Sequence, residues 1–135
     1  MKIQLHKLLL IATAISVIFT IFTFLYKFTT PFDFNEYATI YSTSQYVKGP
    51  AATTTMGDDG LFSFAGYYML LQGGNPTQVD FENPPLGKYL IGLSILIFKN
   101  ERVISIIYSV LLLLVTYKLG LQIFKNQTIA SLAIL

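Results

Sequence analysis

Two adjacent carboxylates, Asp58 and Asp59, are the first residues whose type and spacing suit chemistry. A carboxylate near a hydroxyl can take its proton while the oxygen attacks, so either residue is a candidate general base. Neighbouring residues on a helix point in different directions, so the pair is not expected to face one ligand. The alternative is that both only favour a helix start, by up to about 1 kcal/mol. The sequence leaves open both interpretations, and also which residue would be the base.

A second polar group, in residues 80–88 (DFENPPLGK), precedes a hydrophobic run. The two adjacent prolines stiffen the chain there, and they place Glu82 and Asn83 just outside the run. Lys88 follows in the first predicted helical turn. Its ammonium group can meet the phosphate of a lipid-linked donor, or it can extend to ordinary lipid headgroups. Lys88, with Glu82 and Asn83 beside it, is therefore a candidate donor-binding group.

Hydrophobic runs are the elements that must position these residues. The 135 residues are 53% hydrophobic and 12% charged, whereas soluble domains carry about a quarter charged residues. Charge-poor runs cover 8–26, 84–98 and 103–124, and about 20 apolar residues cross a bilayer as a helix. The run at 84–98 is short for a crossing and is expected to start outside the hydrocarbon or to lean on neighbours. No small-residue cleavage site follows the first run, which favours a retained anchor over a cleaved signal.

These runs predict an all-α integral membrane protein with one long extracytoplasmic loop. Residues 1–27 are the cytoplasmic end and first transmembrane helix, and residues 28–83 are the loop. Residues 84–124 are predicted to form a transmembrane hairpin with a polar turn at 99–102. Residues 125–135 begin a fourth helix that stops short, so the chain is expected to be an N-terminal fragment of a multi-pass protein.

The loop 28–83 holds six of the seven acidic residues, whereas lysines precede the first run and basic residues lie in the turn 99–102. The positive-inside rule therefore predicts a cytoplasmic N-terminus and turn, with the loop outside. Lys118 and Lys125 then fall on the outer side, where lysines near helix ends can snorkel.

Inside the loop, a short amphipathic helix is predicted at about 59–72, because acidic residues precede an apolar stretch that glycines follow. It is too short to span a membrane, so it is expected at the membrane surface or packed on the helical bundle. The Thr-, Gly- and Ala-rich stretch 42–56 predicts irregular structure.

Composition excludes other classes of function. The net charge of +2 is too small and scattered for a nucleic-acid-binding protein, and the absence of cysteine excludes disulfides and thiolate metal sites within this chain. The one histidine, His6, is expected to be a polar residue that only flanks the first run.

The order of these motifs resembles that of the GT-C glycosyltransferases, over roughly residues 56–124. The pair Asp58-Asp59, an Ala/Gly/Tyr-rich stretch and the string NPPLGKYLIGL follow one another. This is similar to the first outer loop of the dolichyl-phosphate-mannose protein O-mannosyltransferases, with Asp-Glu and His-Pro-Pro-Leu-Gly-Lys. It is more distantly similar to the lipid A aminoarabinose transferases, with Asp-Glu and Phe-Glu-Lys-Pro-Pro-Leu.

The resemblance implies transfer of a mannose-like sugar, with inversion, from a polyprenyl phosphate to a hydroxyl of protein, lipid or glycan. The family's catalytic Asp falls on Asp58 and its following Glu on Asp59. Glu82 matches a residue that helps to hold a metal in the aminoarabinose branch, so a divalent metal is a candidate cofactor, although no firm metal site is predicted. Asn83 stands where the two branches have His and Lys. The protein is expected in the plasma membrane of a prokaryote or the endoplasmic reticulum of a eukaryote. The fragment alone is expected to be inactive.

A different class of function is a membrane transporter or lipid-binding protein whose loop is a lid. Ionisable residues at mid-membrane depth would favour that class. The three hydrophobic runs have essentially none, which favours the transferase interpretation. A small, complete membrane interaction protein is a third interpretation, and the short last helix argues against it.

Overall fold

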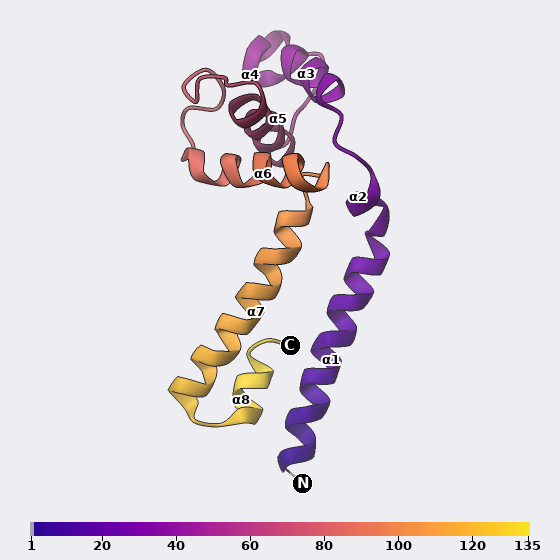
Figure 1. Ribbon diagram of the computed structural model, residues 1–135, viewed down its shortest axis with the longest axis vertical. Helices are drawn as coiled ribbons and strands as arrows, with labels where there is room; N and C mark the ends of the chain where they lie inside the picture. Colours follow the sequence, from indigo (N-terminus) through magenta and orange to yellow (C-terminus); the bar gives the residue numbers. More distant parts are fainter. Residues whose placement is uncertain (1) are drawn as a thin grey trace. The chain divides into compact units, whose positions relative to one another are not determined.

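The computed structural model describes residues 2–135, and the side chains of residues 5–135. Among the described residues all regular structure is helical, which confirms the predicted all-α class. The helices are α1 (Lys2–Thr23), α2 (Leu25–Thr29), α3 (Phe34–Thr43), α4 (Gln45–Lys48), the 3-10 helix η1 (Gly49–Ala51), α5 (Asp58–Leu71), α6 (Pro85–Phe98), α7 (Val103–Phe124) and α8 (Gln127–Leu132) (Figure 1).

The chain divides into two compact units. Unit 1 consists of Met1–Lys27 and Ser105–Leu135, and it contains α1, α8 and nearly all of α7. Unit 2 is the continuous segment Phe28–Ile104, and it contains α3 to α6. Both candidate acids and the PPLGK string therefore belong to unit 2.

Unit 1 contains the two described helices that are long and apolar enough to cross a membrane, at Leu5–Thr23 and Val103–Phe124. Only 6% of each of these windows is buried. A helix that is apolar and exposed nearly all round does not behave as a core helix of a soluble protein, and it suits a lipid environment. The bounds of α7 are those of the predicted third run, 103–124.

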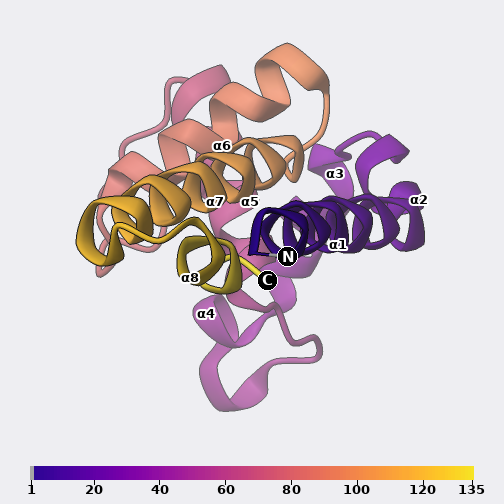
Figure 2. The same ribbon diagram turned by 90° about the horizontal axis from the view of Figure 1, so that it is seen from below.

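The short helix α8 packs on α1 within unit 1 (Figure 2). Its N-cap Asn126 accepts hydrogen bonds from the backbone N–H groups of Thr128 and Ile129, which explains why a helix begins there. His6 lies 2.6 Å from the buried Ser131 hydroxyl, measured from Nδ1 to Oγ. His6 is therefore a tertiary contact residue, and not only the flanking polar residue that the sequence suggests.

Helix α5 is the centre of unit 2 and lies between α3 and α6 (Figure 1). It ends at Leu71, two residues before Gly73, whose φ of +66° is strained for any other residue, and Gly74 N–H donates to the Tyr68 carbonyl at 3.0 Å. The core cluster around α5 consists of Met56, Leu61, Phe64, Ala65, Met69 and Val79, with aromatic rings of α3 packed against it. The predicted helix at about 59–72 is thus present within a residue at each end. Of its two expected positions, it has the packed one, and it is the most enclosed helix of the unit.

Helix α3 and the short α4 and η1 are not predicted from the sequence. Asp33 caps α3 by accepting hydrogen bonds from the N–H groups of Asn35 and Glu36, at 2.9 and 3.4 Å. The predicted irregular stretch 42–56 contains the end of α3, all of α4 and all of η1. Its small polar residues are held by hydrogen bonds such as that from the Thr54 hydroxyl to the Ile40 carbonyl, at 3.0 Å.

The turn after α6 folds back on the start of unit 2, a contact that the predicted hairpin does not anticipate. Phe32 N–H donates to the Lys99 carbonyl, and the Asn100 side-chain amide donates to the Thr30 carbonyl, each at 2.8 Å. The turn 99–102 is thus part of the same folded unit as the start of the loop, and α6, with 14 residues, is shorter than the two described helices that suit a membrane span.

Candidate functional site around the first turn of helix α5

Asp58 and Asp59 occupy the first turn of α5, and both side chains are exposed. The N-cap is Gly57, without a side-chain cap, so neither carboxylate is the N-cap residue. The Asp58 carboxylate accepts a hydrogen bond from the Tyr46 hydroxyl, at 3.1 Å. The Asp59 carboxylate lies back toward Gly57, because a Cβ on that glycine would be 2.9 Å from Asp59 Oδ1. The two carboxylates thus have different neighbours, Tyr46 for Asp58 and Gly57 for Asp59.

Gln45 of α4 holds the backbone that leads into this turn. Its side-chain amide donates to the Met56 carbonyl at 2.7 Å, and its side-chain oxygen accepts from Met56 N–H at 3.0 Å. The Met56 side chain is buried at the same time, with 3% of its surface exposed. These contacts from both sides of Met56 fix the position where α5 begins, and with it the acidic pair.

Tyr46 is a polar neighbour that the sequence does not single out. Burial, together with the hydrogen bond to Asp58 and its negative charge, raises the pKa of the Tyr46 hydroxyl above its ordinary value. The hydroxyl therefore stays protonated near neutral pH and can donate to Asp58. A lone tyrosine 12 positions before an aspartate carries no sequence signal, because the contact depends on how α4 folds.

Lys88 is buried, and the loop before α6 encloses its ammonium group. The Nζ atom lies 2.9 Å from Asp80 Oδ2 and 3.0 Å from the Asn83 carbonyl oxygen, and it also donates to the Asp80 carbonyl. An ammonium group has three donors, so these contacts satisfy it. With 2% of its surface exposed, Lys88 is enclosed by its own loop, whereas the sequence suggests a contact with lipid phosphate or headgroups. It is an internal clamp for residues 80–83.

Asp80 is the partner that the clamp requires. Its φ of +51° is unusual for a residue other than glycine, and it lets both the backbone carbonyl and the carboxylate contact Lys88. Its other carboxylate oxygen, Oδ1, accepts from the Asn83 side-chain amide at 2.8 Å. Asn83 thus serves the clamp, whereas Glu82 is exposed. No three metal-ligating side chains gather within residues 5–135, so Glu82 would need ligands from elsewhere to hold a metal.

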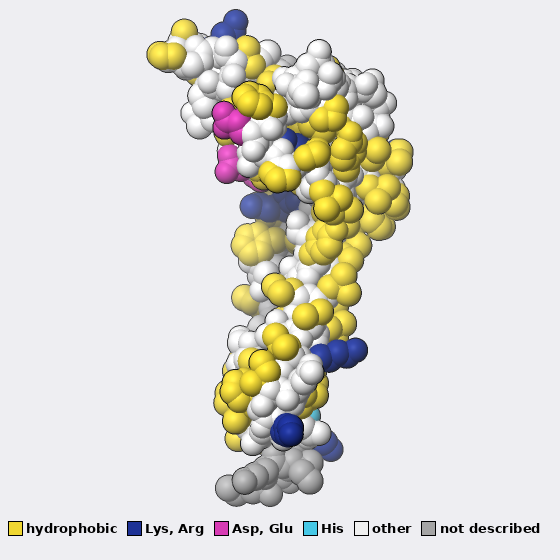
Figure 3. Space-filling model, turned by 90° about the vertical axis from the view of Figure 1, so that its left-hand side faces the viewer, with side chains coloured by type: hydrophobic (Ala, Val, Ile, Leu, Met, Phe, Trp, Pro, Cys, Tyr) yellow, Lys and Arg dark blue, Asp and Glu magenta, His cyan; other side chains and the backbone are white. Residues whose placement is uncertain are grey.

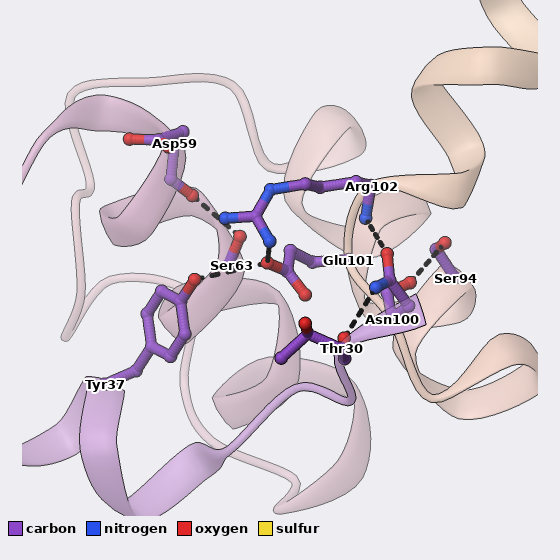
Figure 4. A network of polar contacts seen from close by, with 8 residues as sticks. All are labelled: Thr30, Tyr37, Asp59, Ser63, Ser94, Asn100, Glu101 and Arg102. Atoms are coloured by element: carbon purple, nitrogen blue, oxygen red, sulfur yellow. Dashed lines mark hydrogen bonds and ion pairs between the residues drawn. The ribbon is translucent and has the colours of Figure 1, made fainter. Parts of the chain in front are cut away.

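A buried polar network lies beside the first turn of α5 (Figure 4). Glu101 Oε1 lies 2.6 Å from the Arg102 guanidinium and accepts from the Tyr37 hydroxyl at 3.2 Å. Burial and the negative charge of Glu101 raise the pKa of Tyr37. Figure 4 shows Asp59 and Ser63 next to these residues, and the Ser63 hydroxyl donates to the Asp59 carbonyl at 2.7 Å. The network joins α3 to the turn before α7.

Ser94 and Asn100 extend this network toward α7. The Ser94 hydroxyl donates to the Asn100 carbonyl at 2.8 Å and accepts from Ile104 N–H at 3.2 Å. The Asn100 side-chain oxygen accepts from Arg102 N–H at 2.8 Å. The turn that joins α6 to α7 is thus built into unit 2 by side-chain contacts.

Comparison of the chain with family models, with curated proteins and with solved structures finds no match. Fold and site together define a helical chain with two apolar helices that suit a membrane, and with a second folded unit that lies between these helices in the sequence.

Proposed function

We propose that this chain is the N-terminal part of a GT-C-type membrane glycosyltransferase, which transfers a mannose-like sugar from a polyprenyl phosphate to a hydroxyl acceptor. The observation that carries the proposal is the exposed acidic pair at the first turn of α5, within a folded unit between two helices that are apolar enough to span a membrane. The resemblance of the motif order to that family supports the same conclusion.

The proposal includes a topology in which α1 and α7 cross the membrane and residues 28–102 lie outside. The cytoplasmic side then holds Lys2, Lys7, Lys118 and Lys125, as the positive-inside rule favours. The predicted hairpin instead places Lys118 and Lys125 outside, which conflicts with that rule. All seven acidic residues lie outside. Two of the basic residues outside, Lys88 and Arg102, are paired with Asp80 and Glu101.

In the proposed reaction, Asp58 or Asp59 takes the proton of the acceptor hydroxyl as its oxygen attacks the anomeric carbon. The bond from that carbon to the phosphate oxygen breaks, and the lipid phosphate leaves with the electron pair. Because this is one displacement, the anomeric centre is inverted. The charge that develops on the phosphate needs cationic groups, which we assign to parts of the protein outside this chain, because Lys88 is already paired.

Asp58→Asn and Asp59→Asn, each made in the natural protein that contains this chain, test the proposal. Membranes are assayed with a labelled polyprenyl-phosphate mannose and a hydroxyl acceptor. Loss of a general base lowers the transfer rate by about 10²–10⁴-fold, so one variant should lose transfer while both insert normally. Glu36→Gln, at an exposed acid of α3, is the matched control. Wild-type rates in both Asp variants would refute the proposal.

Single cysteines test the topology, because the chain has no thiol of its own. Gln78→Cys and Lys99→Cys lie at exposed positions of unit 2 and should react with a membrane-impermeant maleimide from outside intact cells. Gln127→Cys, beyond α7, should react only after permeabilisation. Labelling of position 99 from the cytoplasmic side only would contradict the proposed topology and restore the hairpin.

A further inference from the structure

Helix α6 presents a continuous apolar face away from α5. Leu86, Leu93 and Ile97 are exposed over 68%, 40% and 59% of their surfaces. Their spacing of seven and four residues places them on one helix face. Lys88, Gly92 and Ile95 are buried on the other face, against α5. In the upper part of Figure 3, hydrophobic side chains gather on one flank and the visible acidic side chains on the opposite flank.

The length and connection of α6 identify what covers this face. Its 14 residues span about 21 Å, short of the roughly 30 Å hydrocarbon core. Only residues 99–102 separate it from α7, a helix that suits a membrane span, and four residues reach at most about 14 Å. The C-terminal end of α6 is therefore held close to the point where α7 leaves unit 2.

Phe81, in the loop before α6, is exposed over 73% of its surface. The clamp between Lys88 and Asp80 holds this loop against the first turns of α6. It adds a second exposed apolar side chain near the end of α6 where Leu86 lies. Exposed apolar side chains along a helix too short to span the bilayer favour a position in the membrane interface.

We propose that α6 lies flat in the leaflet that borders unit 2, with Leu86, Leu93 and Ile97 at the boundary between headgroups and acyl chains. The lipid surface is the partner of this face. Helices of this kind bury their apolar side by about 5–10 Å. Helix α6 would thus hold unit 2 against the bilayer, and α5 packs on the face of α6 that points away from the lipid. This proposal concerns how unit 2 contacts the membrane, and it does not depend on sugar transfer.

Tryptophan reporters test this proposal, because the chain contains no tryptophan. Leu86→Trp, Leu93→Trp and Ile97→Trp are made one at a time in the full chain and reconstituted into phosphatidylcholine vesicles. Separate vesicles carry lipids brominated near the glycerol end or near the terminal methyl of the acyl chain. Thr53→Trp, at an exposed position tied to α3, is the control.

A helix that lies in the interface gives all three α6 reporters the same depth, with severalfold stronger quenching by the bromines near the glycerol end, while the control stays unquenched. A helix that crosses the bilayer would instead place position 93 deepest, with strongest quenching by the deep bromines. A face covered by protein would show no quenching at any of the three positions. Either of these results would overturn the proposal.

Discussion

A Cβ atom on Gly92 of α6 would lie 2.4 Å from the backbone oxygen of Gly66 on α5, and one on Gly66 would lie 2.4 Å from the Lys88 carbonyl oxygen. The two helices are therefore in backbone contact where they cross. No side chain fits into this crossing unless the helices move apart, because the atoms in the way are backbone and cannot rotate aside.

Gly92→Ala should consequently destabilise unit 2 by about 1–3 kcal/mol, the usual cost of overpacking a close contact. Thermal unfolding in detergent, followed by circular dichroism, measures the effect. Gly87→Ala is the matched control on the same helix, since a Cβ there meets nothing within 4 Å, and it should be neutral or slightly stabilising. Equal midpoints for the two variants would show that the crossing is looser than described.

Lys88→Met should destabilise the protein strongly, because it leaves the Asp80 carboxylate, 6% exposed, without its cation. Breaking a buried ion pair typically costs about 3–5 kcal/mol. The double variant Lys88→Met with Asp80→Asn should recover part of that loss, and Glu82→Gln, at an exposed site, should change stability by less than about 0.5 kcal/mol. A Lys88→Met protein of normal stability, with only a raised KM for the donor, would favour the phosphate-binding role instead.

Tyr37 should make the protein sensitive to alkaline pH. Its folded-state pKa is raised, first by burial and then by Glu101, so the unfolded chain loses this proton first as the pH rises. The contribution of Tyr37 to the free energy of unfolding is thus complete below about pH 10, the ordinary tyrosine pKa. It is lost as the pH rises above that value. Unfolding midpoints measured between about pH 8 and 11 should fall less steeply in Tyr37→Phe than in the wild type. If the unfolding midpoint fell equally steeply with pH in both proteins, Tyr37 would not contribute to the alkaline sensitivity.

Tyr46→Phe distinguishes between the two candidate bases. The Tyr46 hydroxyl donates to Asp58 and thereby orients that carboxylate. A hydrogen bond of this kind is worth about 1 kcal/mol, or roughly fivefold in rate. If Asp58 is the base, kcat for sugar transfer should fall about two- to tenfold in Tyr46→Phe with stability nearly unchanged. A normal kcat would instead assign the role of general base to Asp59.

Hydropathy and helix-boundary signals predict much of this fold. The apolar run 103–124 coincides with α7, because nothing but length and composition decides a helix of this kind. The start of α5 at Asp58 and its end before Gly73 follow from acidic residues in the first turn and a residue with positive φ after the last. Asp33, followed three residues later by Glu36, is a capping signal for α3 that the loop interpretation overlooks.

The role of α6 depends on contacts that no local pattern encodes. A lysine in the first turn of an apolar run suggests a headgroup contact, whereas the structure encloses Lys88 with Asp80, eight positions earlier. An apolar run also does not reveal whether glycines such as Gly92 face lipid or a second helix. The hydrogen bond from Phe32 to Lys99 joins residues 67 positions apart, and only tertiary folding brings them together.

That hydrogen bond has a practical consequence, because it brings the first and last segments of unit 2 together. A domain whose ends meet behaves as an insertion, which tolerates removal better than a domain threaded through its neighbours. Replacing residues 31–100 with a short Gly/Ser linker should therefore leave a shorter protein that keeps α1, α7 and α8 and inserts into membranes as the whole chain is proposed to do. Such a deletion would separate membrane insertion of α1 and α7 from the proposed sugar transfer in one step.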